Sequence, residues 1–233
     1  MDFTKFAQGT FANLAEDKQQ AIIRAALFEF ASQGYQRASC NNVVKAAAIS
    51  KGSLFQYFGS KEGLFLFVFG RFVGKVKAAV KEATARQEDF FALVQAILTA
   101  GLHFIKRYPQ YFQMYLQVLF EQEVPRRREL LAEVRLFSSD YFGPICARAR
   151  EQGVIRTDIG VEMVIFILDA AIDRFLQAYA RPYLDAGLGL ASLSEADLQD
   201  KVEELLVVLK NGLQPPGLYS GSRGKGQGAR GER

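Results

Sequence analysis

The residues with the most evident chemistry lie between positions 51 and 58, where polar and apolar side chains alternate at helical spacing. Leu54 and Phe58, four residues apart, would hold one face of a helix against a core. The opposite face would then carry groups that can reach the base edges or phosphates of a nucleic acid. Its positions are Lys51, Gly52, Ser53, Gln56 and Tyr57. The pattern indicates a nucleic-acid contact; the alternative is a solvated face on an ordinary helical bundle.

A second short helix, predicted over about residues 40–47, would position that face. Ser39 is suited to cap its N-terminus by accepting a hydrogen bond from the backbone of Asn42, and Ser50 can cap the following helix. Two short helices joined by a tight turn form a helix-turn-helix, whose second helix can dock in a major groove. The sequence therefore predicts a helix-turn-helix over about residues 39–58.

Lys61 opens the next predicted helix, directly after a serine that can cap it. A cation at a helix N-terminus opposes the helix macrodipole. A phosphate held there by free backbone N–H groups and by the ammonium would remove that conflict. We therefore expect Lys61 to bind a phosphate; the alternative is a surface lysine paired with a nearby acid.

The chain is expected to be helical nearly throughout, because apolar residues recur three and four positions apart and no hairpin signal appears. The predicted helices span about 13–33, 40–47, 51–58, 61–86, 88–107, 110–121, 126–152, 159–181 and 195–211. Gly34 should end the first helix, and Gly143 with Pro144 should break the seventh. The predicted fold class is all-α, with about nine helices.

Composition excludes several classes of protein. The chain has 233 residues, a net charge of +4, two cysteines and one histidine. Two cysteines are too few for a disulfide-rich secreted module, and a single histidine argues against a His-rich metal site. The sequence has no phosphate-cradling glycine loop and no Cys/His/Asp array. We therefore predict neither an enzyme nor a bound metal or cofactor.

Membrane insertion and export are not expected either. The longest charge-free run, residues 90–105, has 16 residues and falls short of the roughly 20 that a spanning helix needs. The N-terminus has no apolar signal segment, so a cytoplasmic protein is expected. The surplus positive charge lies at the two ends, with +2 over residues 1–62 and +3 over residues 213–233. This distribution fits a polyanion partner for the N-terminal segment.

A longer stretch around these residues resembles a known family. The segment Ala48-Ile-Ser-Lys-Gly-Ser-Leu-Phe-Gln-Tyr-Phe-Gly-Ser-Lys-Glu-Gly-Leu64 is similar to the signature of the tetracycline-repressor (TetR) family of bacterial transcriptional regulators. Upstream, Ala25-Ala-Leu-Phe-Glu-Phe-Ala-Ser-Gln-Gly-Tyr35 and Ser39 also match, and the likeness covers about residues 16–70.

The resemblance implies which residues would contact double-stranded DNA. They are Ser39, Lys51, Gly52, Ser53, Phe55, Gln56, Tyr57 and Lys61. The family usually has Tyr where this chain has Phe55, Gly where it has Ala48 and Thr where it has Ser39. These departures leave DNA binding expected and the operator sequence open.

The resemblance also implies a two-part plan. Residues 13–62 would form a three-helix DNA-binding domain, and residues 63–212 a larger helical domain that binds a small effector and dimerises. The helices over 159–181 and 195–211 are apolar on broad faces, so they would form a four-helix interface with a second copy; the alternative is an ordinary internal core. Residues 213–233, rich in glycine and basic residues, would be a flexible tail.

Aromatic residues crowd the middle of the chain, and an apolar cavity among them is the expected effector site. The candidate lining residues are Phe69, His103, Tyr111, Tyr115, Phe137 and Phe142. Asp169 and Asp173 lie four residues apart in an apolar segment, where buried carboxylates need partners. Arg174 or a partner subunit could pair with them, or they could bind a cationic ligand.

The residues and the resemblance together favour a homodimeric, ligand-responsive regulator. It would act as a repressor that a small apolar or aromatic effector releases from a palindromic operator. The runner-up is a helical adaptor that binds protein without specific DNA binding. The two differ in a measurable property, because the affinity of a DNA-binding protein must fall as salt concentration rises.

Overall fold

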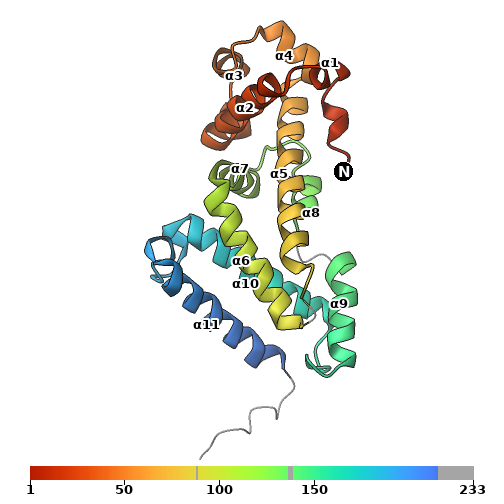
Figure 1. Cartoon of the computed structure of the whole chain (residues 1–233), viewed down its shortest axis with the longest axis vertical. Coiled ribbons are helices and arrows are strands. Elements are labelled where there is room, and N and C mark those ends of the chain that lie inside the picture. Colours follow the sequence, from red (N-terminus) through yellow and green to blue (C-terminus); the bar gives the residue numbers. More distant parts are fainter. Residues whose placement is uncertain (88, 136–138, 215–233) are drawn as a thin grey trace, which may run out of the picture.

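The structure, a computed structural model, describes residues 1–87, 89–135 and 139–214. Within these ranges the chain is helical and contains no strand, which confirms the predicted all-α class (Figure 1). The elements are η1 (Thr4–Phe6), α1 (Gly9–Ala12), α2 (Glu16–Arg37), α3 (Cys40–Ala46), α4 (Lys51–Phe58), α5 (Lys61–Thr84), α6 (Phe90–Arg107), α7 (Pro109–Phe120), α8 (Arg127–Val134), α9 (Ser139–Glu151), α10 (Val161–Ala180), η2 (Pro182–Leu184), η3 (Leu190–Ser192) and α11 (Glu195–Leu213).

The predicted seventh helix is two helices, but the break is not where the sequence placed it. Helix α8 ends at Val134, and α9 runs from Ser139 through Pro144 without ending. A proline inside a helix removes one backbone hydrogen bond. Around it, Phe142, Cys146 and Ala149 are all buried in one core, and their packing holds the helix together across Pro144.

Helix α2 departs from helical geometry at Gly34, as predicted, but does not end there. Gly34 has φ +71° and ψ 172°, and one more turn follows as far as Arg37. At the other end of the chain, α11 includes Leu213, which is buried, so the helix runs two residues beyond its predicted end. The rest of the predicted tail, from residue 215, lies outside the described residues.

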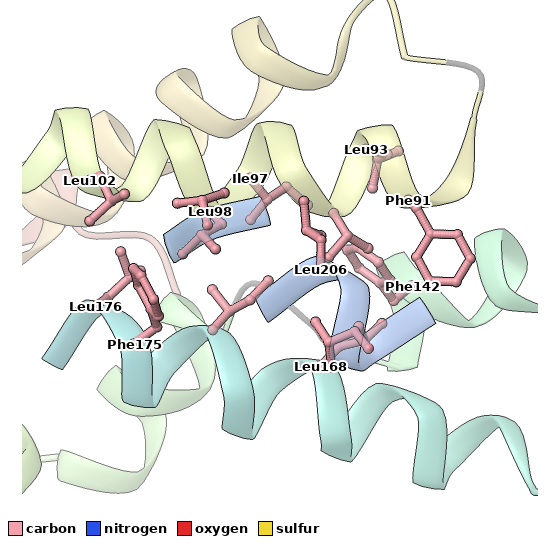
Figure 2. Packing of buried hydrophobic residues seen from close by; sticks show 14 of the residues in the cluster. Phe91, Leu93, Ile97, Leu98, Leu102, Phe142, Leu168, Phe175, Leu176 and Leu206 are labelled. Atoms are coloured by element: carbon pink, nitrogen blue, oxygen red, sulfur yellow. The ribbon is translucent and has the colours of Figure 1, made fainter. Parts of the chain in front are cut away.

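The buried side chains form two cores, and one of them lies between α6, α9, α10 and α11. Figure 2 shows the packing that closes it: leucines of α6 face α10 across the core, and α11 covers one side. The labelled contributors are Phe91, Leu93, Ile97, Leu98 and Leu102 of α6, Phe142 of α9, Leu168, Phe175 and Leu176 of α10, and Leu206 of α11. Helix α6 is the one helix in the described ranges whose length and composition would suit a membrane span, and half of that span is buried here.

The other core supports the N-terminal helices and extends beyond them. It includes Phe11, Phe30, Val43 and Leu54, and it continues through α5 as far as Val73. Side chains of α6, α7 and α8 also belong to it. The predicted domain boundary at residue 62 therefore does not coincide with a boundary between cores, because α5 is shared by both parts (Figure 1).

Candidate nucleic-acid interface and effector cavity

Helices α3 and α4 form the predicted helix-turn-helix. Val43 and Leu54 are each 1% exposed, so both helices are held to the N-terminal core from their inner faces. The turn between them passes through Ala48, which has φ +50°. The Ser50 side chain accepts a hydrogen bond from the backbone N–H of Ser53 at 3.0 Å, which confirms the predicted cap of α4.

The N-terminus of α3 is held differently from the predicted Ser39 cap. Ser39 makes no side-chain capping bond; instead its backbone N–H donates to Glu29 Oε1 at 2.8 Å. The same oxygen accepts a hydrogen bond from Asn42 Nδ2 at 3.0 Å. Glu29 is buried, and a carboxylate in the middle of the apolar run from Ala25 to Ala31 needs donors. A glutamate within this apolar run is the sequence feature that indicates a buried, hydrogen-bonded carboxylate.

The outer side of α4 is more limited than predicted. Lys51, Gly52 and Gln56 are exposed, and Phe55 is 37% exposed. Tyr57 is only 8% exposed, so its predicted place on the outward face is wrong. Its ring lies 6.0 Å from that of Phe11, centroid to centroid, in an edge-on contact.

The reason is the short helix α1, which lies before the first predicted helix. Helix α1 packs against α4, and Phe11 is its buried residue. The backbone N–H of Gln8, just before α1, donates to the carbonyl oxygen of Tyr57 at 2.8 Å. The N-terminal segment thus covers the side of α4 on which Tyr57 lies.

Lys61 lies at the N-terminus of α5, where Ser60 accepts a hydrogen bond from the backbone N–H of Gly63 at 3.0 Å. The Lys61 ammonium donates to the carbonyl oxygen of Gln36 at 3.0 Å and lies 4.9 Å from the centre of the Tyr35 ring. Lys61 therefore links α5 to α2 through a backbone carbonyl and an aromatic ring.

The charges of Lys51 and Lys61 act on the same region. Burial raises the pKa of the Cys40 thiol, at the start of α3, and both ammonium groups oppose that rise. Two cations therefore lie near the first turn of α3, in addition to the exposed polar groups of α4. This arrangement suits a phosphate backbone that passes across the motif.

Helix α7 holds the N-terminal helices to the rest of the molecule by polar contacts with α2. A carboxylate oxygen of Glu121, the residue after α7, accepts a hydrogen bond from the backbone N–H of Tyr35 at 3.0 Å. Gln36 Nε2 donates to the carbonyl oxygen of Glu123 at 2.7 Å, and Gln117 Nε2 donates to that of Ala31 at 3.3 Å. The bond to the Tyr35 N–H lies next to Gly34, where α2 is kinked. The end of α7 therefore contacts α2 at the point where the geometry of α2 changes.

A cavity of about 200 Å³ lies between α5, α6, α7, α8 and α10. Its walls are mostly apolar, and its polar groups are few: Tyr115, Arg135, Asp169 and Asp173. The apolar lining includes Phe72, Val76, Val80, Phe104, Phe112, Leu119, Leu131, Val134, Ile172 and Leu176. A concave apolar site with few polar groups is the usual form of a small-molecule site.

The polar groups are connected to one another. Tyr115 Oη donates to Asp173 Oδ1 at 3.0 Å, and Gln177 Nε2 donates to Asp173 Oδ2 at 2.5 Å. Arg135 Nε lies 3.9 Å from Asp169 Oδ2. Asp169 thus pairs with Arg135 and not with the predicted Arg174. Burial is the main cause that raises the pKa of both carboxyl groups, and the charge of Asp173 adds to the rise for Asp169.

Of the six predicted lining residues, Tyr115 lines this cavity. Phe69 and Tyr111 are buried in the N-terminal core, and Phe142 is buried in the other core. The rings of these three residues fill space between helices and do not border this cavity. The His103 side chain is 64% exposed, lies 3.9 Å from a Glu195 oxygen and borders a separate, open hollow between α5 and α6. Phe137 lies outside the described residues.

Across the described part of the chain, no three His, Cys, Asp or Glu side chains gather as metal ligands would. Cys146 is buried, and burial raises its pKa to about 11, so the thiol is held in its neutral form at neutral pH.

The motif, its cations and the cavity together define a helix-turn-helix DNA-binding protein with a second helical part. Comparison with known proteins agrees. Residues 22–68 match the model of bacterial regulatory proteins of the tetR family. A crystal structure of a TetR family transcriptional regulator from Chloroflexus aurantiacus superposes with a TM-score of 0.73 at 24% identity, and the match covers 90% of this chain and 99% of that one.

Two bacterial regulators are similar in sequence. The chain is 25% identical over 165 residues to the "Probable acrEF/envCD operon repressor" of Escherichia coli K12, covering 68% of this chain and 74% of that protein. It is 24% identical over 209 residues to the HTH-type transcriptional regulator RutR of the same strain, covering 85% of this chain and 91% of that protein. Residues 22–68 thus match the tetR family of bacterial regulatory proteins, and over most of its length the chain resembles TetR-family regulators in sequence and in fold.

Proposed function

We propose that this chain is a repressor that binds a palindromic operator as a homodimer and leaves it when a small effector occupies the cavity. The observation that carries the proposal is that the cavity shares two helices with the DNA-binding part. Phe72 and Val76 line it from α5, which follows directly on α4, and Tyr115 and Leu119 line it from α7, which contacts α2. An occupant that repacks these side chains would reach the helix-turn-helix through both.

The proposed mechanism is a shift between two populations. A ligand moves an equilibrium only as far as its affinities for the two states differ. A dimer reads two half-sites on one face of the DNA, so small changes in the angle or spacing of its recognition helices alter affinity. An effector that binds more tightly when α5 and α7 are displaced from their DNA-bound positions would therefore cause the dimer to release the operator.

Exposed apolar side chains support the dimer. Helix α10 leaves Met163 50% and Phe166 66% exposed, and α11 leaves Val207 54% and Val208 67% exposed. Large apolar side chains in contact with water mark interaction surfaces when they gather on an element. We therefore propose that α10 and α11 form the dimer interface, and that the two-fold axis of the dimer matches that of the operator.

The deciding experiment is selection of bound sequences from a random DNA pool with the purified chain at two salt concentrations. The expected result is a palindromic sequence whose affinity falls steeply as salt rises. A Gln56→Ala variant should change the preferred bases, because Gln56 is exposed on α4 and can pair with a base edge. Recovery of no sequence above the starting pool would instead favour the helical adaptor.

A further inference from the structure

The cavity is more specific in its chemistry than an apolar effector site requires. We propose that it takes a small aromatic amine: an apolar ring between the apolar walls, with a single ammonium group bound at Asp169 and Asp173. This inference rests on the proposed function of the cavity as the effector site. It is carried by the size of the cavity, by its apolar walls and by the charges of its lining.

Size restricts the occupant first. A cavity of about 200 Å³ is somewhat larger than the roughly 150 Å³ apolar cavity that is known to bind benzene. One six-membered ring with a short side chain fits, and a molecule of several fused rings does not fit without repacking. The rings of Phe72, Phe104 and Phe112 border this space, so a flat apolar body has suitable partners.

The charge of the lining then selects the polar group. Two carboxylates and one guanidinium border the cavity, which leaves one negative charge when both acids are ionised. The Arg135 side chain is 64% exposed and lies 3.9 Å from the Asp169 oxygen, so most of its charge is screened by water. The hydrogen-bond donors recorded for Asp173 are Tyr115 and Gln177, both of them neutral.

A buried carboxylate without a cationic partner is costly, and an ammonium supplies that partner. The aromatic rings of the lining reinforce the choice, because ring faces attract cations. An anion would meet two carboxylates, and a neutral ligand would leave the negative charge uncompensated. The lining contributed by α5 and α6 is apolar throughout, so it adds no competing charge.

Protonation follows from the same geometry. The groups that interact with Asp173 are Tyr115 on α7 and Gln177 and Asp169 on α10; Arg135, after α8, pairs with Asp169. Burial raises the pKa of both carboxyl groups, and the hydrogen bonds from Tyr115 and Gln177 partly offset this for Asp173. A bound ammonium favours the ionised form, so binding should be accompanied by release of protons.

The test uses three probes of nearly equal size: phenethylamine, phenethyl alcohol and phenylacetate. Their binding to the full chain is measured by titration calorimetry at neutral pH. The amine should bind more tightly than the alcohol, and phenylacetate least. Asp173→Asn should weaken amine binding about tenfold or more, since a hydrogen bond to a charged group is lost, and should leave alcohol binding nearly unchanged.

Two further variants keep the result interpretable. Glu151→Gln removes an exposed acid at the end of α9, outside the cavity, and should leave amine binding unchanged. Asp169→Asn, at a side chain that is 34% exposed, repeats the test if the more buried Asp173 variant does not fold. Retained alcohol binding shows that the cavity is intact.

Three outcomes would overturn the inference: equal binding of amine and alcohol, preference for phenylacetate, or no binding of any probe. None of these touches the proposed function, which is tested separately by operator selection in the absence of ligand. If the chain selects an operator and the amine preference is absent, the inference alone fails. If no operator is selected, the proposed function fails, whatever the cavity binds.

Discussion

Replacement of Gly34 by alanine should destabilise the protein strongly, because two separate features of the structure oppose a side chain there. The backbone has φ +71° and ψ 172°, a region that only glycine occupies readily. A Cβ atom at this position would lie 1.7 Å from Glu121 Oε1 and 2.6 Å from Glu121 Cδ. The carboxylate of Glu121 would have to move, and its hydrogen bond with the Tyr35 N–H would be lost.

The two effects can be given magnitudes. Backbone strain of this kind costs about 1–3 kcal/mol. Leaving the Tyr35 N–H without its acceptor costs about 1–3 kcal/mol if the group stays away from water. Gly34→Ala should therefore lower the free energy of unfolding by roughly 2–6 kcal/mol, a large share of the roughly 5–15 kcal/mol that stabilises a typical protein.

Urea denaturation of a double-mutant cycle separates the two effects. The cycle consists of Gly34→Ala, Glu121→Ala and the double variant, with Gly74→Ala as a matched control. A Cβ at Gly74, inside α5, meets nothing within 4 Å, so that change should be neutral or stabilising. In the Glu121→Ala background, Gly34→Ala should cost less by about 1–3 kcal/mol, because the displaced carboxylate is already gone.

Strict additivity of the two single changes would refute this reasoning. It would mean that the Glu121 carboxylate does not occupy the kink in α2, and that the contact between α7 and the DNA-binding part is made elsewhere. A destabilisation by Gly34→Ala no larger than that of an ordinary surface change would refute the assigned backbone geometry as well.

Three further predictions concern DNA, assembly and pH. Lys61→Ala should weaken operator binding, measured by fluorescence anisotropy, and should reduce the steepness of log affinity against log salt by about 0.9. The control Lys201→Ala, on α11, should change neither quantity. An unchanged slope for Lys61→Ala would remove Lys61 from the phosphate contacts. Phe166→Glu should raise the dimer dissociation constant, measured by analytical ultracentrifugation, by about 100-fold or more. The control Phe120→Glu, at a comparably exposed side chain on α7, should leave that constant unchanged. Equal effects would argue against α10 as part of the dimer interface. Phenethylamine affinity measured by calorimetry should rise as the pH increases through the pKa of Asp173, which burial raises, because the charged form that binds a cation is reached only above that pKa. An affinity that does not change with pH would contradict this.

The helix-turn-helix could be predicted closely because its determinants are local. Leu54 and Phe58 are four residues apart and both are buried, as their spacing predicts. The caps at Ser50 and Ser60 act within three residues of their own positions. Such signals depend on neighbours along the chain, so a single sequence contains them completely.

Tyr57 shows where this reasoning stops. Its position on α4 agrees with an outward face, yet α1 packs there and buries its ring against Phe11. Helix α1 has four residues and no strong periodicity, so the sequence offered little sign of it. The Ser39 cap is absent because the backbone N–H of Asn42 donates to the Ser39 carbonyl oxygen at 3.1 Å, and the start of α3 is instead held by Glu29, ten positions earlier in the chain.

The sequence by itself determined the helical class, the helix-turn-helix motif and the resemblance to the TetR family, since each follows from spacings of a few residues and from a signature within about fifty. The tertiary structure alone decided the shape and lining of the cavity. The walls of the cavity come from five helices between residues 72 and 176. The way those helices cross decides that the ring of Phe69 fills a core and that the ring of Tyr115 borders the cavity. Crossing angles and gaps are set by contacts between residues far apart in the chain, which periodicity along the sequence does not record.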